Sequence, residues 1–476
     1  MPDTALVWFR RDLRLSDNPA LAAACERHAR VIPVFIWSPD EEAPWQPGGA
    51  SRWWLHHSLA ALQKNLTARG SPLVIRAGDS LNELRKLIQE TGATAVYWNR
   101  LYEPAVIAGD KQIKESLRAD DLEAESFNAA LLMEPWEMKT LAAGEPYRVF
   151  TPFYKALRSR LPTRVLHRVP ARIAGPEKPV TSLALEALKL LPAIPWDTGF
   201  SQHWQPGEAG AQKRLEAFCE AAVGHYQEQR DLPAASATSK LSPHLHFGEI
   251  SPQQIFARVQ RLLAENTEAG ALKNAEGFIR EVGWREFSHH LLYHFPKTPL
   301  QPMYDKFAPF PWRKNYQADL RAWQKGMTGF PIVDAGMREL WSTGIMHNRV
   351  RMITASLLTK NLLIPWQEGA KWFWDTLVDA DLAQNTLGWQ WTAGCGADAA
   401  PYFRVFNPVL QSKKFDPDGI YIKRWVPELS TLSGSELFAP WEAAKPPKNY
   451  PAPIVELSAS RERALAAYQE IRNAVA

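Results

Sequence analysis

The first 37 residues decide the fold of the N-terminal part of the chain. They contain TALVWF (residues 4–9), NPALAAACERHA (residues 18–29) and RVIPVFIW (residues 30–37). The outer two segments are rich in β-branched and aromatic residues, which favour strands, and the middle segment has apolar residues at helical spacing. A strand, a helix and a second strand in this order predict a parallel β-α-β unit.

The same alternation continues to about residue 130. Further strand-like runs lie at residues 71–77, 93–99 and 122–127, and further helical patterns at residues 51–66, 80–92 and 110–120. We therefore predict an α/β domain over residues 1–130, built on a doubly wound parallel sheet of five strands. Ligands of such folds lie beyond the carboxyl ends of the strands.

The rest of the chain differs from this pattern. Residues 131–204 are rich in proline and basic residues and lack a sustained period, so we interpret them as a long linker across the surface. From GAQKRLEAFCEAAVGHYQEQRD (residues 210–231) onward the patterns are helical and strand-like runs disappear. This change predicts an all-α domain over residues 205–476.

The composition narrows the class of protein. Hydrophobic residues make up 46% of the chain, which is typical of a globular protein, and the formal net charge of +4 permits a basic face for nucleic acid without requiring one. The 20 tryptophans outnumber the 12 tyrosines. Because a buried indole needs a partner for its N–H, this excess indicates ring-stacking surfaces as well as packing.

Several classes of site are disfavoured by what the sequence lacks. Cys25, Cys219 and Cys395 lie far apart without a C-x-x-C motif, which argues against a structural zinc site, an iron–sulfur cluster or a disulfide framework. Neither G-x-G-x-x-G nor a P-loop motif follows the first strand. No apolar run has the length of a signal peptide or a membrane span, so we expect a cytoplasmic protein with no membrane partner.

Two polar stretches adjoin predicted helices. In WFRRDLRLSDNPAL (residues 8–21), Arg10 and Arg11 crowd the end of the first strand, and Ser16 and Asp17 are candidate caps of the next helix. In TLVDADLAQNTLGWQW (residues 376–391), two carboxylates and an amide stand against two indoles within a hydrophobic pattern. Each buried polar group without a partner costs about 1–3 kcal/mol, so these groups must surround something that satisfies them.

Other constellations lie in the helical half. Thr238, Ser239 and Ser242 surround Lys240, which suits either an anion-binding loop for a phosphate or a cluster that caps a helix. Glu281 and Trp284 share a helix face that suits a planar, hydrogen-bonding ligand. His290 and His294 have chelating spacing, but no third ligand follows, so we expect no metal site.

The chain resembles the photolyase/cryptochrome family over nearly its whole length. The motifs that carry the resemblance occur in the family's order: VWFRRDLRLSDNPAL (7–21), TSKLSPHLHFGEISP (238–252), GWREF (283–287), TGFPIVDAGMRELWSTGIMHNRVRM (328–352), DADLAQNTLGWQW (379–391) and DAAPYFRVFNP (398–408). The resemblance implies an N-terminal antenna domain, a helical domain that binds FAD, and light-driven electron transfer.

The resemblance also implies roles for particular residues. Those expected to bind FAD are Tyr226, Thr238, Ser239, Lys240, Leu241, Ser242, Arg351, Asp379, Asp381 and Asn385. Within this set, Asp379 would pair with Arg351, Asp381 would accept from the polar edge of the flavin, and Asn385 would face flavin N5. A chain of indoles that conducts electrons to the flavin would comprise Trp389, Trp366 and Trp312. The sequence NTLGW replaces the family's common NNGGW, so Thr386 and Leu387 are positions where the flavin environment differs.

The substrate implied by the resemblance is UV-damaged DNA. A cyclobutane pyrimidine dimer pocket would be formed by Glu281, Trp284, Asn348, Met352 and Trp391, with Asn385 also counted as catalytic, and DNA phosphates would meet Arg230, Arg349 and Arg404. Reduced FAD would then repair the flipped-out dimer in light, as in the bacterial class III subgroup. The segment MHNRVRM (346–352) differs from the histidine pair of enzymes that act on the (6-4) photoproduct.

Two alternatives and one further cofactor complete the expectations. The alternatives are a cryptochrome-type blue-light photoreceptor without repair activity and a non-catalytic flavin or nucleotide carrier. The resemblance implies an antenna chromophore, methenyltetrahydrofolate or else 8-hydroxy-5-deazaflavin, near Trp37, Glu42, Trp45 and Glu103. We expect a monomer.

Overall fold

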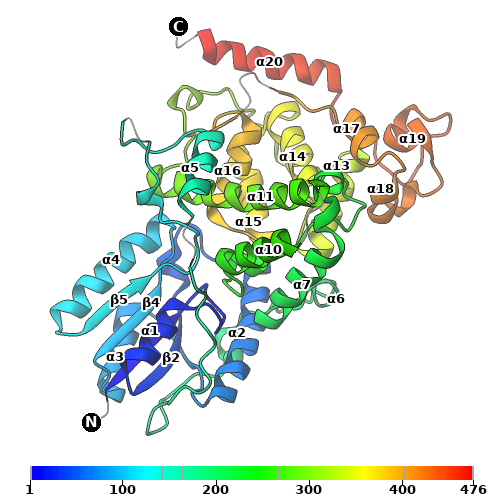
Figure 1. Cartoon of the computed structure of the whole chain (residues 1–476). Helices are drawn as coiled ribbons and strands as arrows, with labels where there is room; N and C mark the ends of the chain where they lie inside the picture. Colours follow the sequence, from blue (N-terminus) through cyan, green and yellow to red (C-terminus); the bar gives the residue numbers. More distant parts are fainter. Residues whose placement is uncertain (1–2, 141–142, 162–163, 266–268, 400–403, 474–476) are drawn as a thin grey trace.

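The structure is a computed structural model of the chain, and it describes residues 3–140, 143–161, 164–265, 269–399 and 404–473. An α/β domain formed by the N-terminal residues lies against a larger helical region (Figure 1). Within the described residues, no helix is long and apolar enough to cross a membrane.

The predicted five-stranded parallel sheet is confirmed. Its strands are β1 (Thr4–Phe9), β2 (Arg30–Trp37), β3 (Val74–Ala77), β4 (Ala95–Asn99) and β5 (Glu123–Phe127). Their order is β3-β2-β1-β4-β5, and every neighbouring pair is parallel. The chain therefore winds outward from β1 in both directions, which places the carboxyl ends of the strands along one edge.

Alternating residues of β1 explain why both faces of the sheet are covered. Ala5, Val7 and Phe9 pack in one core with α1 (Pro19–Arg27) and α2 (Gly49–Arg69). Leu6 and Trp8 point to the other face, where the covering helices are α3 (Ser80–Thr91) and α4 (Pro104–Ala119). A strand buried on both faces reads as a continuous apolar run, as TALVWF does.

The predicted caps of α1 are wrong. Asn18 is the N-cap, and its side chain accepts a hydrogen bond from the Leu21 N–H at 3.1 Å. The carboxylate of Asp17 is instead occupied by Arg164, at 2.6 Å, and by the Ser251 hydroxyl, also at 2.6 Å. Asp17 thus joins the α/β domain to two distant segments.

Residues 131–204 contain more structure than a linker requires. Helix α5 (Phe150–Arg160) buries Phe150, Phe153 and Leu157 in a core shared with α11 (Ala269–His294). Further along, the segment follows the α/β domain, where the Ile173 N–H donates to the Arg69 carbonyl at 2.8 Å. Helix α6 (Phe200–His203) closes the segment.

The helical region is mostly built of short helices. They are α7 (Glu208–Ala221), α8 (Tyr226–Gln229), α9 (Ser242–His246), α10 (Pro252–Glu265), α11, α12 (Gln317–Gln324), α13 (Pro331–Thr343), α14 (Asn348–Ser356), a π-helical segment (Leu357–Asn361), α15 (Trp366–Thr376), α16 (Leu382–Ala393), α17 (Pro408–Phe415), α18 (Ile420–Trp425), α19 (Gly434–Phe438) and α20 (Leu457–Asn473). Helix α16 packs against α11, α14 and α15, so side chains on its different faces meet different neighbours.

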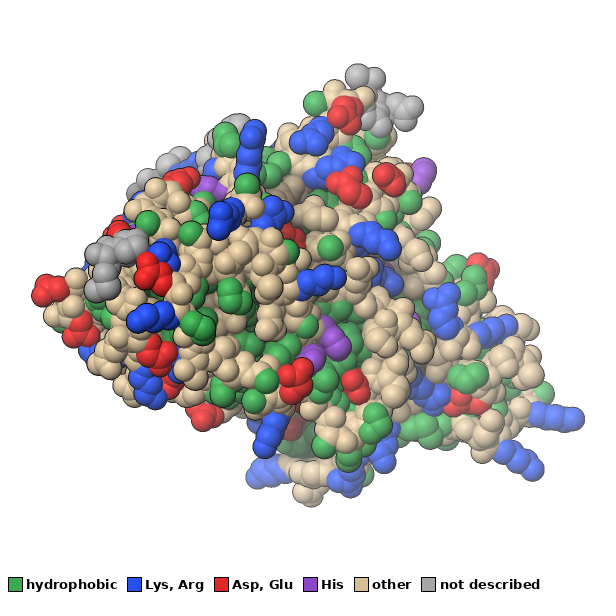
Figure 2. Space-filling view, turned by 90° about the horizontal axis from the view of Figure 1, so that it is seen from below, with side chains coloured by type: hydrophobic (Ala, Val, Ile, Leu, Met, Phe, Trp, Pro, Cys, Tyr) green, Lys and Arg blue, Asp and Glu red, His purple; other side chains and the backbone are tan. Residues whose placement is uncertain are grey.

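The surface seen from below carries both signs of charge. Lys and Arg side chains are scattered over this face, and Asp and Glu side chains lie between them (Figure 2). The mildly basic composition is therefore not gathered into one large patch on this face.

Candidate active site

Asp381 begins helix α16 and is the most heavily contacted carboxylate of the site. Its Oδ1 accepts from the Gln384 N–H at 2.9 Å, as expected of an aspartate N-cap. Its Oδ2 lies 3.7 Å from His246 Nδ1 and 3.4 Å from His289 Nε2. Burial works to raise the pKa of Asp381, but His289 and His246 outweigh it and hold this pKa well below its ordinary value. The carboxylate is therefore ionised within the protein.

Asp379 forms a second buried carboxylate group. Both of its oxygens accept from Arg351 Nη2 at 2.9 Å, and the Ser242 hydroxyl donates to Oδ2 at 2.7 Å. Arg351 is fixed in turn by the Met346 carbonyl, 2.8 Å from its Nε. The expected Arg351–Asp379 pair is thus present, and it ties α14 to the first residue of α9.

Asn385 lies one turn along α16 from Asp381. Its Nδ2 donates to the Ala370 carbonyl of α15 at 3.0 Å. This bond sets the orientation of the amide and so determines where its oxygen points. We call Arg351, Asp379, Asp381 and Asn385 the flavin site.

The loop before α9 favours the ligand-binding alternative over the capping alternative. The N-cap of α9 is Leu241, and no side chain caps this helix end. Lys240 has a left-handed φ of 51°, and burial, followed by the neighbouring Arg214, lowers its pKa. Tyr226 is buried behind the loop. The Ser242 hydroxyl donates to Asp379 and the Ser239 hydroxyl accepts from the Leu241 N–H at 3.4 Å, so Thr238 and Lys240 are the loop residues that suit the phosphates of FAD.

The five residues expected at the dimer share an intermediate position between core and solvent. Asn348 is exposed, and the other four are partly buried: Glu281, Trp284, Met352 and Trp391. One face of the Trp284 ring is stacked on Phe150 at 3.7 Å, with an angle of 8° between the ring planes. Phe150 therefore fixes the plane of this indole.

Two of the arginines expected at DNA phosphates already have acidic partners. Arg230 donates through Nη1 to the Glu281 carboxylate, and Arg349 donates to Asp231 at 2.7 Å. Arg404 is exposed, and its carbonyl accepts from the buried Lys360. Residues 400–403 of the DAAPYFRVFNP motif lie outside the described part of the chain.

The tryptophans expected to conduct electrons lie in one region. Trp366 and Trp389 belong to the same buried core, and Trp312 packs against it. No role was predicted for Trp323, which is fully buried with its ring centroid 6.1 Å from that of Trp389. Gly369 allows the close approach of α15 to α16, because a Cβ there would lie 2.0 Å from the Trp389 ring.

Thr386 and Leu387 are the two positions at which the sequence departs from the family's common NNGGW. Together with Ser288, Leu291 and other residues they line a small cavity of about 20 Å³ between α11 and α16. Their side chains therefore act on the packing of α16.

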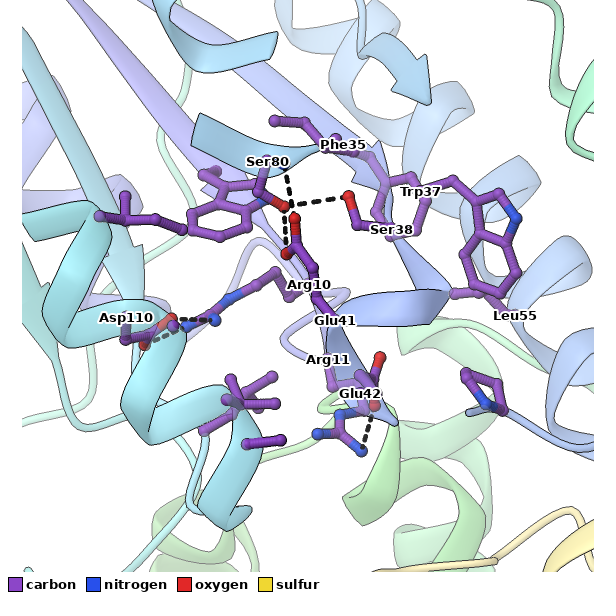
Figure 3. Close-up of a pocket in the computed structure, with 18 of the residues that line it drawn as sticks. Arg10, Arg11, Phe35, Trp37, Ser38, Glu41, Glu42, Leu55, Ser80 and Asp110 are labelled. Atoms are coloured by element: carbon purple, nitrogen blue, oxygen red, sulfur yellow. Dashed lines mark hydrogen bonds and ion pairs between the residues drawn. The ribbon is translucent and has the colours of Figure 1, made fainter. Parts of the chain in front are cut away.

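A separate cavity of about 210 Å³ opens at the carboxyl ends of β1 and β2. We call it the antenna pocket. Of the four expected residues, Trp37 and Glu42 line it (Figure 3). Trp45 and Glu103 do not line the pocket, but each contacts a residue that does. Trp45 packs on Trp374 with 5.5 Å between the ring centroids, and Glu103 pairs with Arg11.

Two cations that line the antenna pocket are paired with acids. Arg10 contacts Asp110 at 2.6 Å, and Arg11 contacts Glu42 at 3.7 Å (Figure 3). Arg11 also contacts Glu103 at 2.7 Å. Burial raises the pKa of Glu42, and Arg11 opposes that shift. Arg10 and Arg11, which the sequence places directly after the first strand, thus both line this pocket.

The comparisons with known proteins match this arrangement. Residues 5–174 match the family model of DNA photolyase, and residues 278–470 match the FAD binding domain of DNA photolyase. The deoxyribodipyrimidine photo-lyase of Agrobacterium fabrum is 49% identical, with 98% of both chains covered. The chain belongs to the photolyase/cryptochrome family.

Other relatives show how the chain sits within this family. The crystal structure of a bacterial class III photolyase from Agrobacterium tumefaciens has a TM-score of 0.94 at 48% identity, and the match covers 99% of this chain and 98% of that one. Cryptochrome-2 of Arabidopsis thaliana is 39% identical over 100% of this chain and 80% of its own length. Proteins named photolyase and proteins named cryptochrome thus both occur among the relatives.

The side chains of the flavin site fit the cofactor of this family. Hydroxyl groups and Lys240 at the loop of residues 238–242 suit phosphates. The Arg351–Asp379 pair, Asp381 and the Asn385 amide supply both donors and acceptors for the polar edge of an isoalloxazine ring. His246 and His289, which orient Asp381, were not found from the sequence because they lie on other helices.

Proposed function

We propose that the chain is a deoxyribodipyrimidine photo-lyase of the class III type, which uses light to split cyclobutane pyrimidine dimers in DNA. One observation carries this proposal: three helices each carry a residue that belongs to the flavin site or contacts it, and a partly buried residue that is expected at the dimer. Helix α11 carries His289 and Trp284, α14 carries Arg351 and Met352, and α16 carries Asn385 and Trp391. The substrate would therefore lie against the cofactor.

The residues of the chain would hold and orient both partners. The Arg351–Asp379 pair and Asp381 would hold the polar edge of the flavin, with Asn385 at N5. Trp284 and Trp391 would pack against the flipped-out dimer, and Glu281 and Asn348 would hydrogen-bond its exocyclic groups. Reduced FAD, when bound, supplies the electron that splits the dimer and recovers it afterwards.

DNA binding would depend on charge without reading sequence. Arg230, Arg349 and Arg404 would contact phosphates, which supply affinity and register. Because Arg230 and Arg349 are held by acidic neighbours, their guanidinium groups are fixed before DNA arrives. Trp389, Trp366 and Trp312 would carry electrons from the surface to the flavin when it must be reduced.

The pigment of the antenna pocket would be methenyltetrahydrofolate, with 8-hydroxy-5-deazaflavin as the alternative. Glu42 supports the folate, since a partly buried carboxylate in contact with one arginine at 3.7 Å has oxygens to offer to the N–H groups of a pterin ring. We also infer that the enzyme works as a monomer in the cytoplasm, where its three free thiols would stay reduced. Light scattering during gel filtration tests the monomer.

The deciding experiment measures repair directly. The photoreduced protein is mixed with an oligonucleotide that contains a thymine dimer, and the recovery of thymine absorbance is followed in light and in darkness. We expect recovery only in light, and its loss in Trp284→Ala. Trp136→Ala, which removes a tryptophan that is 39% exposed and has no part in the site, should repair normally. Flavin photoreduction without recovery would refute repair and favour the blue-light photoreceptor.

A further inference from the structure

The antenna pocket and the flavin site are separated by a single layer of side chains. His246 and Arg11 line the antenna pocket. His246 Nδ1 also lies 3.7 Å from Asp381 Oδ2, which belongs to the flavin site. A side chain that belongs to both sites offers a physical route between them.

Arg11 is a cation that contacts two carboxylates and lies within the electrostatic field of a third. Its side chain is 11% exposed and lies 2.7 Å from Glu103 and 3.7 Å from Glu42. Burial works to lower the pKa of Arg11, but Glu103, Glu42 and Asp381 together outweigh it and raise this pKa. Two of these acids belong to the antenna pocket and the third belongs to the flavin site. A change in the attraction of Glu42 or Glu103 for Arg11 therefore changes the electrostatic effect of Arg11 on Asp381.

Asp381 is positioned to pass that change on. It is 7% exposed, so little solvent screens it. On its far side, His289 Nδ1 lies 3.0 Å from the Arg285 carbonyl, which only accepts hydrogen bonds, so Nδ1 carries a proton. The other nitrogen, Nε2, therefore faces the Asp381 carboxylate. Arg11, His246 and His289 thus act on one buried charge beside the flavin.

We propose that occupancy of the antenna pocket is coupled to the redox state of the flavin through Arg11 and Asp381. A pigment that donates N–H groups to Glu42 would weaken the attraction of this carboxylate for Arg11. The positive field of Arg11 would then act more strongly at Asp381 and favour the reduced flavin, which carries negative charge. The inference rests on the proposed function, because it requires both FAD and a pigment.

Coupling of this kind is reciprocal. If the pigment favours the reduced flavin, the reduced flavin must raise the affinity for the pigment by the same factor. The protein would therefore load its light-harvesting pigment preferentially when the flavin is in the state that repairs DNA.

The first test compares pigment affinity in two redox states. Methenyltetrahydrofolate is titrated onto the full FAD-loaded chain with the flavin oxidised and with it chemically reduced. We expect the Kd to be about fivefold lower in the reduced protein, within the usual range of coupling between sites. Arg11→Gln should bring the two Kd values together. Equal values in the unsubstituted protein overturn the proposal.

Arg10 supplies a matched control for Arg11. It lines the same pocket and pairs with Asp110 at 2.6 Å, away from Asp381. Arg10→Gln should weaken pigment binding yet keep the fivefold ratio. Loss of the ratio in both variants would overturn the assignment to Arg11, since it would then follow from any damage to the pocket.

A second readout needs no pigment. In pigment-free protein, Arg11→Gln should lower the midpoint potential of the flavin by about 20 mV, which is a fivefold change for a two-electron couple, and Arg10→Gln should leave it unchanged. An unchanged potential in Arg11→Gln overturns the coupling whichever pigment the protein uses. The outcome that refutes the proposed function is different. In that case the protein binds flavin and shows the coupling, but it repairs no dimers in saturating light.

Discussion

Arg230 donates a hydrogen bond to Glu281, so a residue expected to contact DNA holds a residue expected to contact the dimer. Arg230 follows α8 and Glu281 belongs to α11, so the pair joins these two helices. Their side chains are 22% and 30% exposed, which places the pair at the rim of the site. Arg230 uses Nη1 for Glu281, so its other N–H groups can contact a DNA phosphate while the Glu281 carboxylate stays oriented for the dimer.

Substitution of Arg230 should therefore affect two steps. Arg230→Ala removes a phosphate contact, which lowers the slope of log Kd against log salt by about 1. It also leaves Glu281 without the partner that orients it, so repair per bound dimer should fall too. DNA titrations at several salt concentrations, followed by single-turnover repair of the saturated complex, measure the two effects separately.

Arg349→Ala is the control for this prediction. Arg349 pairs with Asp231, which has no expected contact with the dimer, and its Nη1 lies 3.8 Å from the sulfur of Met352. Because a methionine sulfur is only a weak acceptor, we expect the same change in salt dependence with repair of the bound dimer nearly unchanged. If Arg230→Ala also repairs its bound dimer at full rate, Glu281 does not depend on Arg230 for its position.

A second prediction concerns the buried Asp379 carboxylate. Asp379→Ala leaves Arg351 without its partner, and breaking a buried ion pair in this way costs about 3–5 kcal/mol. We expect the free energy of unfolding by urea to fall by that order and the affinity for FAD to fall with it. Ser242→Ala removes one hydrogen bond from the same carboxylate and should cost about 1 kcal/mol. Equal losses in the two variants would show that the ion pair adds nothing beyond the hydroxyl contact.

The α/β domain could be predicted because its signals are local. The central strands β1, β2 and β4 are apolar runs buried on both faces, as Leu6 and Val7 in β1 illustrate, and turn residues separate each strand from the next helix. Helix α5 escaped notice although Phe150, Phe153 and Leu157 have helical spacing. Pro152 lies in its first turn, where proline is tolerated, and prolines around it made the whole segment resemble a linker.

The site was predictable only in part, for a different reason. Asp381 and Asn385 lie on one helix, so their common direction follows from spacing. The contacts of Asp381 with His246 and His289 join segments that are far apart in sequence, and nothing local marks either histidine as its partner. The packing of the core likewise decides which tryptophans come into contact, so the sequence did not predict that Trp323 lies beside Trp389.

A third prediction follows from Glu286, a buried acid on α11. Burial raises its pKa to about 7, although Arg285, His289 and the N–H groups of Leu132 and Met133 oppose the shift. The folded chain thus favours the protonated acid more than the unfolded chain does. This contribution to stability is full below about pH 4.5, the ordinary value for glutamate, and is lost as the pH rises through about 7.

Glu286→Gln should remove this loss. Glutamine keeps an oxygen that can accept from the Leu132 N–H, 2.7 Å from Glu286 in the structure, and it cannot ionise. The free energy of unfolding by urea is measured for both proteins at pH 5 and at pH 8. The stabilisation caused by the substitution should be about 2–3 kcal/mol larger at pH 8 than at pH 5. Glu276→Gln, at a carboxylate on α11 that is 44% exposed, is the control. The same stabilisation at both pH values would contradict the ionisation argument.

The last prediction separates flavin reduction from repair. Trp389→Phe keeps an aromatic ring in the buried core between α15 and α16 but removes the indole expected to give the first electron to the flavin. We expect photoreduction of FAD to fall to the background rate while FAD stays bound. Chemical reduction of the flavin should restore repair, because the tryptophans are needed only to reduce the cofactor.

Trp323→Phe is the matched variant, since Trp323 contacts Trp389 but lies outside the expected route through Trp366. Transient absorption of the two variants measures the electron transfer directly. Equal loss of photoreduction in both would place Trp323 on the route, and undiminished photoreduction in Trp389→Phe would remove Trp389 from it.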